Sequence, residues 1–228
     1  MESQSIVSKG EVKMERLLLG VEAFDFLEKE GIPILKTVLA KDENEAVMTA
    51  SQIGFPVALK VSSPDIVHKT ETGGIRVNLK DEGEVRAAFT EIVRTFTSDH
   101  PGQRLEGVVV QKLGKGLELI VGTMTDQQFG PVIMFGLGGI FVEALNDVSF
   151  RLIPLEARDA KEIMEDLQVY KILKNPRGEK VNLEAVQNFI LQVSCLVDKH
   201  PEIREMDLNP IFASPKGVEV CDARIKIG

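Results

Sequence analysis

The spacing of apolar side chains divides the chain into alternating helical and extended segments. In residues 11–30, apolar side chains recur every three or four positions, which predicts an amphipathic helix that ends at Gly31. The same spacing predicts further helices over residues 43–52, 81–98, 156–167 and 183–199, and Asp42 is placed to cap the first of them. Runs rich in β-branched residues predict strands over residues 32–39, 57–61, 74–79, 107–113, 117–125 and 131–135.

The order of these segments indicates an α+β architecture. Residues 203–211 and 218–225 form a predicted hairpin, and the strands at 107–113 and 117–125 are also close neighbours, which argues against a purely parallel doubly wound sheet. The polar segment at 99–106 contains a proline and a glycine and is typical of a joint. We therefore expect two α+β lobes, residues 1–105 and 106–228, that meet at a cleft.

Composition and charge narrow the classes of function. The 228 residues include 27 Lys and Arg against 35 Asp and Glu, a net charge of −8, which argues against nucleic-acid binding but leaves room for a single nucleotide. The sequence lacks both a membrane-length apolar run and the apolar core of a signal peptide. The two cysteines form no CxxC motif. We expect a cytoplasmic protein with no membrane partner.

Two cationic or nucleophilic side chains stand out in the N-terminal half. Lys60 interrupts the apolar strand VALKV, where a lysine is commonly an edge or snorkelling residue; the alternative is a cation that projects into a cleft and binds a phosphate. His68 lies in a polar loop rich in hydroxyl groups. A neutral imidazole is a nucleophile near pH 7, although an exposed loop histidine without a role fits equally well.

Polar side chains alternate along the predicted strand near the C-terminus. Glu205, Asp207 and Asn209 would project from one face, and Asp222 on the following strand could face them. Oxygen ligands of this kind suit Mg²⁺, which takes one or two protein ligands together with water and phosphate. The alternative is a solvated strand face. The glycine-rich turn at 136–139 is likewise either a structural turn or a phosphate cradle.

Taken together, these segments resemble the ATP-grasp fold, in which two α+β lobes hold a nucleotide between them. The residues that carry the resemblance are GFPVALKVSSPDIVHKTETGGIRVNL (54–79), LELIVG (117–122), GPVIMFGLGGIFVE (130–143) and REMDLNP (204–210). The loop SPDIVHKTETGG is typical of the β subunits of ADP-forming acetyl-CoA synthetases, the NDP-forming acyl-CoA synthetase family. The resemblance covers residues 10–228.

The resemblance implies a reaction, a partner and cofactors. The family converts acyl-CoA, ADP and phosphate reversibly to the acid, CoA and ATP. It uses ATP or ADP with Mg²⁺ and requires a separate α subunit, which binds CoA and carries a phosphorylated histidine. The length of the chain, which leaves no room for a CoA-binding half, leads us to expect a separate subunit in a hetero-oligomer.

The resemblance also assigns roles to individual residues. It makes His68 a phosphorylated relay on the loop 62–74 and Asp207 the acid that meets the incoming phosphohistidine. It places the nucleotide and its metal with the following set: Lys60 and the turn at Gly73 and Gly74 at the phosphates, the backbone of Val110, Gln111, Lys112 and Leu113 at the adenine, Glu118 near the ribose, and Asn209 and Asp222 at Mg²⁺.

Two other functions share most of these features. A stand-alone ATP-grasp carboxylate ligase would work without a partner and without a phosphohistidine. A non-catalytic nucleotide-binding module would be expected to lack His68 or the metal ligands, and both are present in this sequence.

Overall fold

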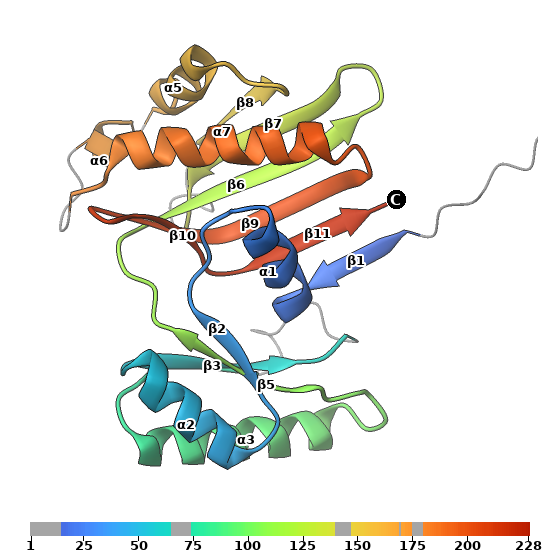
Figure 1. Cartoon of the computed structure of the whole chain (residues 1–228), viewed down its shortest axis with the longest axis vertical. Coiled ribbons are helices and arrows are strands. Elements are labelled where there is room, and N and C mark those ends of the chain that lie inside the picture. Colours follow the sequence, from blue (N-terminus) through green and yellow to red (C-terminus); the bar gives the residue numbers. More distant parts are fainter. Residues whose placement is uncertain (1–14, 65–73, 140–146, 169, 175–179) are drawn as a thin grey trace, which may run out of the picture.

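The computed structural model describes residues 15–64, 74–139, 147–168, 170–174 and 180–228. Two antiparallel sheets form an upper and a lower lobe in Figure 1. The helices of the lower lobe lie beneath its sheet, and those of the upper lobe lie in front of its sheet. This arrangement confirms the predicted α+β class with two lobes. Within the described part of the chain, no helix is both long and apolar enough to span a membrane.

The smaller lobe has a four-stranded sheet backed by two helices. In sheet order the strands are β2 (Thr37–Ala40), β5 (Gly107–Lys112), β3 (Val57–Ser62) and β4 (Ile75–Leu79), and the helices are α2 (Glu43–Ile53) and α3 (Glu82–Asp99). Asp42 caps α2 as predicted, and Asp81 caps α3, since each carboxylate accepts a hydrogen bond from the third backbone N–H of its helix. Apolar residues from both helices and the sheet form one core.

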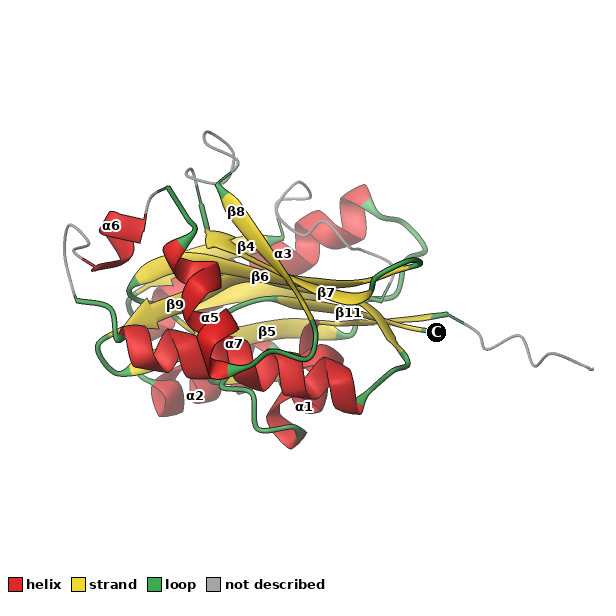
Figure 2. Cartoon of the chain, turned by 90° about the horizontal axis from the view of Figure 1, so that it is seen from above, coloured by secondary structure: helices red, strands yellow, loops and turns green. Residues whose placement is uncertain are grey.

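The larger lobe has a seven-stranded sheet. Its strands are β1 (Arg16–Leu19), β11 (Ala223–Ile227), β9 (Ile203–Ser214), β6 (Leu117–Asp126), β7 (Gly130–Leu137) and β8 (Val148–Leu152), with β10 (Gly217–Val220) paired to the end of β9. The helices are α1 (Gly20–Lys29), α5 (Ala157–Glu165), α6 (Tyr170–Lys174) and α7 (Leu183–Lys199). Helices α1, α5 and α7 lie on one side of the strands (Figure 2), and none of the described helices covers the opposite face, which we call the uncovered face.

Two described stretches of chain cross between the sheets, and backbone hydrogen bonds hold the first to β10 and to the end of β5. The first is residues 30–36, in which the Leu35 N–H donates to the Val220 carbonyl at 2.9 Å and the Pro33 carbonyl accepts from the Val220 N–H at 2.9 Å. The second is residues 113–116, next to the point where the Lys112 N–H donates to the Lys36 carbonyl at 3.0 Å. The crossings lie side by side and form the hinge of the cleft.

Several predicted elements differ in the structure. The helix predicted over 11–30 begins only at Gly20, because Arg16–Leu19 form an edge strand that pairs with β11 at the far end of the chain. Only the last part of the strand predicted over 32–39 is a strand, since residues 32–36 form a crossing. The segment 218–225 is broken into β10 and β11, and β8 and α6 were not predicted.

The two lobes also interleave in sequence. Strand β1 and helix α1 fall within residues 1–105, the range expected for the first lobe, yet they pack against the larger sheet. Residues 1–105 therefore do not form one lobe. The described chain begins in the larger lobe with β1 and α1, enters the smaller lobe at β2 and returns to the larger one after β5.

Candidate functional site

Lys60 points out of the smaller lobe toward the larger one. Val57, Leu59 and Val61 on the same strand enter the helix-backed core, so the two-residue period directs Lys60 to the opposite face. Its Nζ donates to the Cys221 carbonyl at 3.1 Å and lies 3.6 Å from Cys221 Sγ. Because β3 lies between β5 and β4, Lys60 is not on an edge strand. Its amine is a cation at the contact between the lobes.

The hinge residues Val110, Gln111, Lys112 and Leu113 occupy the end of β5 and the crossing that follows it. Val110 is buried in the core of the smaller lobe, whereas Gln111 faces the larger lobe with 1% of its surface exposed. Gln111 Nε2 donates to the Cys221 carbonyl at 3.0 Å. Lys112 lies 3.9 Å from Glu219 in an exposed ion pair. The hinge therefore carries contacts to both lobes.

Glycines let the hinge lie directly on strand β9. A Cβ at Gly114 would come within 2.2 Å of the Phe212 ring, and one at Gly116 would come within 2.2 Å of the Ala213 carbonyl oxygen. Any larger residue at these two positions would lift the crossing chain off the strand. The position of Lys112 and Leu113 relative to the larger lobe depends on this close approach.

Glu118 is the second residue of β6, the strand that follows the hinge, and it packs against the glycine-rich turn. The Gly138 N–H donates to the Glu118 carbonyl at 2.7 Å. A Cβ at Gly139, where φ is +61°, would lie 2.8 Å from Glu118 Oε2. The described part of the 136–139 turn therefore makes room for the Glu118 carboxylate, which agrees with the structural interpretation of this motif.

The acidic residues of β9 share one face, as predicted. Met206 and Leu208 are buried in the core, so Glu205, Asp207 and Asn209 project from the uncovered face of the larger sheet. The Asn209 N–H donates to the Asp222 carbonyl at 3.2 Å, which brings Asp222 beside this row.

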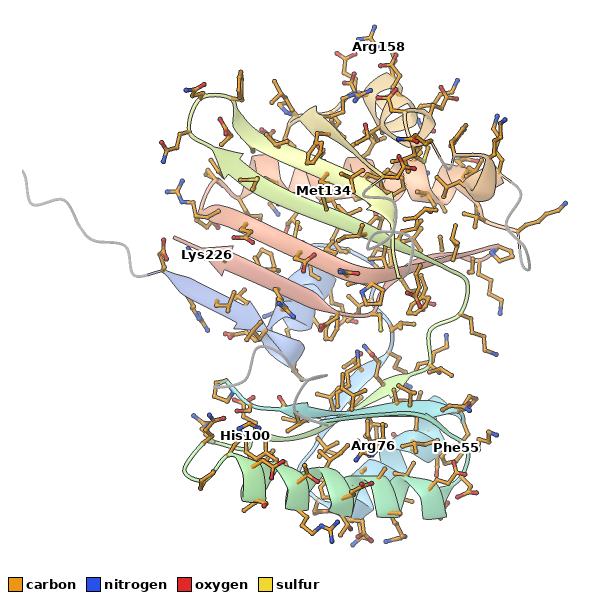
Figure 3. All side chains as sticks on the ribbon, turned by 180° about the vertical axis from the view of Figure 1, so that it is seen from behind. Phe55, Arg76, His100, Met134, Arg158 and Lys226 are labelled. Carbon is orange, nitrogen blue, oxygen red and sulfur yellow. The ribbon has the colours of Figure 1, made fainter. Side chains whose placement is uncertain are left out.

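A shallow pocket lies next to Asp207 on the same uncovered face. Figure 3 shows this face from behind, with Met134 in front of the strands and α7 beyond them. The pocket has a volume of about 310 Å³, and its lining includes Gly122, Met124, Val132, Met134, Phe150, Glu205 and Asp207. A second cavity, of about 660 Å³, opens between the lobes at the base of the loop 62–74, and its lining includes Lys41, Ser62, Ser63 and Arg104.

Neighbouring charges shift the pKa values of Asp207 and Cys221. Partial burial raises the pKa of Asp207, and the negative charges of Asp222 and Glu205 raise it further, while Arg224 on the neighbouring strand opposes the shift. Burial also raises the pKa of the Cys221 thiol. Lys60 lowers that pKa, whereas Asp222 and Glu118 raise it. Cys221 is thus surrounded by three of the predicted site residues.

The donor set at Asn209 and Asp222 fits a divalent cation with few protein ligands. Across the described ranges, no three His, Cys, Asp or Glu side chains are grouped so that they could hold a metal by themselves. One amide oxygen and one carboxylate match Mg²⁺, which retains water and phosphate oxygens in its other positions. The residues present therefore fit Mg²⁺ bound together with a nucleotide.

Two of the predicted residues, His68 and Gly73, lie outside the described residues. Gly74 is described and buried, and its carbonyl accepts from the Val61 N–H at 2.8 Å. At the other end of the loop, Ser62 Oγ donates to Glu106 at 3.1 Å. The two ends of the loop that carries His68 are therefore anchored on β3, next to Lys60.

Two residues at the contact between the lobes were not predicted. Cys221 presents its carbonyl to Lys60 and Gln111, and Thr37 accepts a hydrogen bond from Gln111 Nε2 at 3.0 Å. The alternation of β3 and β5 places Lys60 and Gln111 on one face. Nothing in the sequence indicates that this face meets a turn more than a hundred residues away.

The amino-acid sequence is similar to a known domain family and to several named proteins. Residues 11–227 match the ATP-grasp domain family. The β subunit of ADP-forming acetate–CoA ligase I from Pyrococcus furiosus is 43% identical over 225 residues, which are 98% of this chain and 97% of the relative. The ADP-forming acetate–CoA ligase I of Archaeoglobus fulgidus is also 43% identical, and the matched region covers 96% of this chain but 33% of that longer protein.

Solved structures show the same fold. The acetyl-coenzyme A synthetase 1 of Ca. Korarchaeum cryptofilum, in complex with coenzyme A, Ca-AMPCP and HgCl⁺, superposes with a TM-score of 0.88 and 46% identity, covering 93% of both chains. A second form of that enzyme holds Mg-AMPPCP, with a phosphohistidine segment that points towards the nucleotide-binding site; its TM-score is 0.81 and its identity 43%.

Proposed function

We propose that this chain, which belongs to the ATP-grasp family, is the nucleotide-binding half of an ADP-forming acetate–CoA ligase. Nearly its whole length is similar to the β subunit of such a ligase. The reaction is acyl-CoA + ADP + phosphate ⇌ acid + CoA + ATP. The observation that carries the proposal is the contact of Lys60 with the Cys221 carbonyl, which brings a cation from one lobe to the turn of the other lobe that also contains Asp222.

Nucleotide binding is assigned to groups on both lobes. Phosphoryl transfer depends mainly on positioning and on neutralisation of charge. Lys60 is the cation for the nucleotide phosphates, Glu118 is placed near the ribose, and the backbone from Val110 to Leu113 faces the adenine. Gly74, at the anchored end of its loop, borders the phosphates with Gly73.

Mg²⁺ is assigned to Asn209 and Asp222. When bound, the ion neutralises part of the charge on the nucleotide phosphates. Asn209 lies on β9 and Asp222 in the turn before β11, and the Asn209 N–H donates to the Asp222 carbonyl, so the backbone keeps the two residues next to each other.

The phosphoryl group is proposed to pass through His68. One imidazole nitrogen of His68 would accept the group from a phosphohistidine of the partner; the nitrogen–phosphorus bond in the partner breaks as the new one forms. Transfer to ADP then forms a bond between phosphorus and a terminal ADP oxygen and frees the imidazole. Asp207, at the acidic edge of the pocket on the uncovered face, would meet the incoming partner segment.

A partner subunit is implied by the relatives, which are β subunits. We propose that the partner is a CoA-binding α subunit that carries the acyl substrate. No CoA-binding or acyl-binding role is assigned to the described residues of this chain.

The test is to measure ATP formation from acetyl-CoA, ADP and phosphate with this chain and a cognate CoA-binding subunit, together and separately. We expect ATP only when both are present, and none when Lys60→Met replaces the wild-type chain. Ligation of acid and thiol by this chain alone would instead indicate a stand-alone ligase. Failure of the assembled pair to turn over would contradict the proposal and favour a non-catalytic module.

A further inference from the structure

The contact between the lobes converges on a single backbone oxygen. Gln111 Nε2 lies 3.0 Å and Lys60 Nζ lies 3.1 Å from the Cys221 carbonyl. The two donors come from neighbouring strands of the smaller sheet, while the acceptor belongs to the turn between β10 and β11 of the larger lobe. A carbonyl oxygen has two lone pairs, so it can accept both bonds at once.

The Gln111 amide uses all of its hydrogen-bonding groups. Its nitrogen donates to Thr37 Oγ1 at 3.0 Å within the smaller lobe and to the Cys221 carbonyl across the cleft, and its oxygen accepts from the Cys221 thiol at 3.4 Å. Thr37 lies directly opposite Gln111 in the β2–β5 register. With 1% of its surface exposed, Gln111 is a buried amide fixed in one orientation by partners on both lobes.

We infer that the Gln111 side chain is a positioning residue that clasps the two lobes through the Cys221 carbonyl and thereby holds the neighbouring Asp222 in place for the nucleotide-bound cation. The inference rests on the proposed function and goes beyond the role of the Gln111 backbone at the adenine. Lys60 Nζ donates to the same oxygen, and an ammonium has three N–H groups, so Lys60 can keep this bond and still bind a phosphate.

Gln111 gives the Cys221 carbonyl a second donor besides Lys60. A partly buried carbonyl that loses every hydrogen bond is destabilised, whereas one that retains a bond from Gln111 is not. Gln111 also holds Cys221 in place, and the next residue is Asp222, the proposed Mg²⁺ ligand. The same amide therefore bonds the oxygen that Lys60 contacts and holds the residue next to the proposed metal-binding carboxylate.

The test compares Gln111→Met, which keeps the length of the side chain but removes its hydrogen bonds, with Thr37→Val, which removes only the bond inside the smaller lobe. Calorimetric titration with Mg-ADP is expected to show binding about tenfold weaker in Gln111→Met and nearly unchanged in Thr37→Val. Equal losses in both variants, together with lower thermal stability, would show a merely structural role and overturn the inference.

A second measurement needs no nucleotide. Iodoacetamide labelling followed by peptide mass analysis compares Cys221, at the clasp, with the exposed Cys195, which serves as an internal standard. We expect Gln111→Met to speed the labelling of Cys221 but not of Cys195. Unchanged labelling with unchanged Mg-ADP affinity would overturn the clasp.

The two measurements separate this inference from the proposed function. If the wild-type chain binds no Mg-ADP, the proposed function fails, and the labelling of Cys221 still decides whether Gln111 joins the lobes. If Gln111→Met does not fold, Gln111→Glu replaces it, because the carboxylate keeps the size and polarity of the amide but cannot donate to the Cys221 carbonyl. Wild-type affinity in Gln111→Glu would overturn the inference.

Discussion

Lys60 owes its place in the cleft to the two-residue period of β3, which sends its apolar neighbours into the core and leaves the amine on the opposite face. This much follows from the sequence, because alternation is a local property. The partner of the amine does not follow from it. The Cys221 carbonyl is a backbone atom 161 residues away, and backbone atoms carry no sequence signal.

Asn209 and Asp222 form the proposed Mg²⁺ site, and their removal provides the first prediction. We expect Asp222→Asn or Asn209→Ala to weaken Mg-dependent ADP binding by at least about tenfold, because each removes an oxygen ligand or its charge. Titration in the presence and absence of Mg²⁺ measures the effect. The metal assignment would be refuted if the variants bound Mg-ADP as the wild type does.

Asp207 provides a prediction about pH. Its pKa is raised in the folded chain, chiefly by burial, so the folded state binds the proton more tightly than the unfolded state does. The resulting stability is present below the unfolded pKa and is lost as pH rises through the folded pKa. We therefore expect Asp207→Asn to raise the melting temperature at pH 7 and to slow phosphoryl transfer.

The advantage of Asp207→Asn in thermal unfolding should shrink as pH is lowered toward the ordinary range of an aspartate. Melting curves of the variant and the wild type across that range measure it. A difference that does not depend on pH would show that desolvation of the Asp207 carboxylate is not its origin.

His68 provides a prediction about the relay, from the sequence alone. We expect His68→Ala to abolish ATP formation from acetyl-CoA in the assembled enzyme while Mg-ADP affinity changes little, because the imidazole is proposed as the nucleophile and not as a binding group. A coupled assay of ATP formation and a binding titration on the same preparation separate the two effects. Full activity of the variant would exclude the relay.

Among the elements, those with a strong local pattern were predicted well. The helices α2 and α7 follow their apolar period, and the side chains of the preceding residues, Asp42 and Asn182, cap them. Strand β1 was predicted as helix because its leucines fit both periods over so short a stretch. Pairing with β11 decides its conformation, and that partner lies at the opposite end of the chain.

The hinge is the element whose geometry is most sensitive to a single substitution. We expect Gly114→Ala to lower the stability by roughly 1–3 kcal/mol and to weaken nucleotide binding, because the new methyl group would overlap the Phe212 ring. Chemical denaturation of the single and double variants with Phe212→Leu measures the coupling. The smaller side chain should restore part of the loss, whereas additive losses would show that the two residues do not press on each other.

At the scale of the whole molecule, the net charge of −8 requires local compensation at the nucleotide site. The structure places Lys60 at the contact between the lobes, with Asp222 and Glu118 close enough to act on the same thiol. An anionic nucleotide would approach a site that already holds carboxylates. Binding is therefore expected to need both Lys60 and the divalent cation.

The two-lobed plan of the molecule could be predicted from the sequence, but the way the lobes are joined could not. The neighbouring strands indicated two α+β units. The polar segment at 99–106, expected as the joint, instead lies within the smaller lobe between α3 and β5, and the chain crosses at 30–36 and 113–116. The packing of α1 on the larger sheet and the clasp at Gln111 depend on contacts between residues distant in sequence. Such contacts form only in the folded chain, so the local sequence pattern does not predict them.

The most direct test of the account is a calorimetric titration of Mg-ADP into the wild-type chain, Lys60→Met and the control Lys226→Met. Lys226, labelled in Figure 3, lies on β11, and its Nζ is 2.9 Å from Glu15 Oε2. It has the same charge as Lys60 but lies away from the contact between the lobes. We predict that Lys60→Met binds at least about tenfold more weakly than the wild type and that Lys226→Met binds equally well. Equal affinity of all three proteins would contradict a nucleotide site at Lys60 between the two lobes.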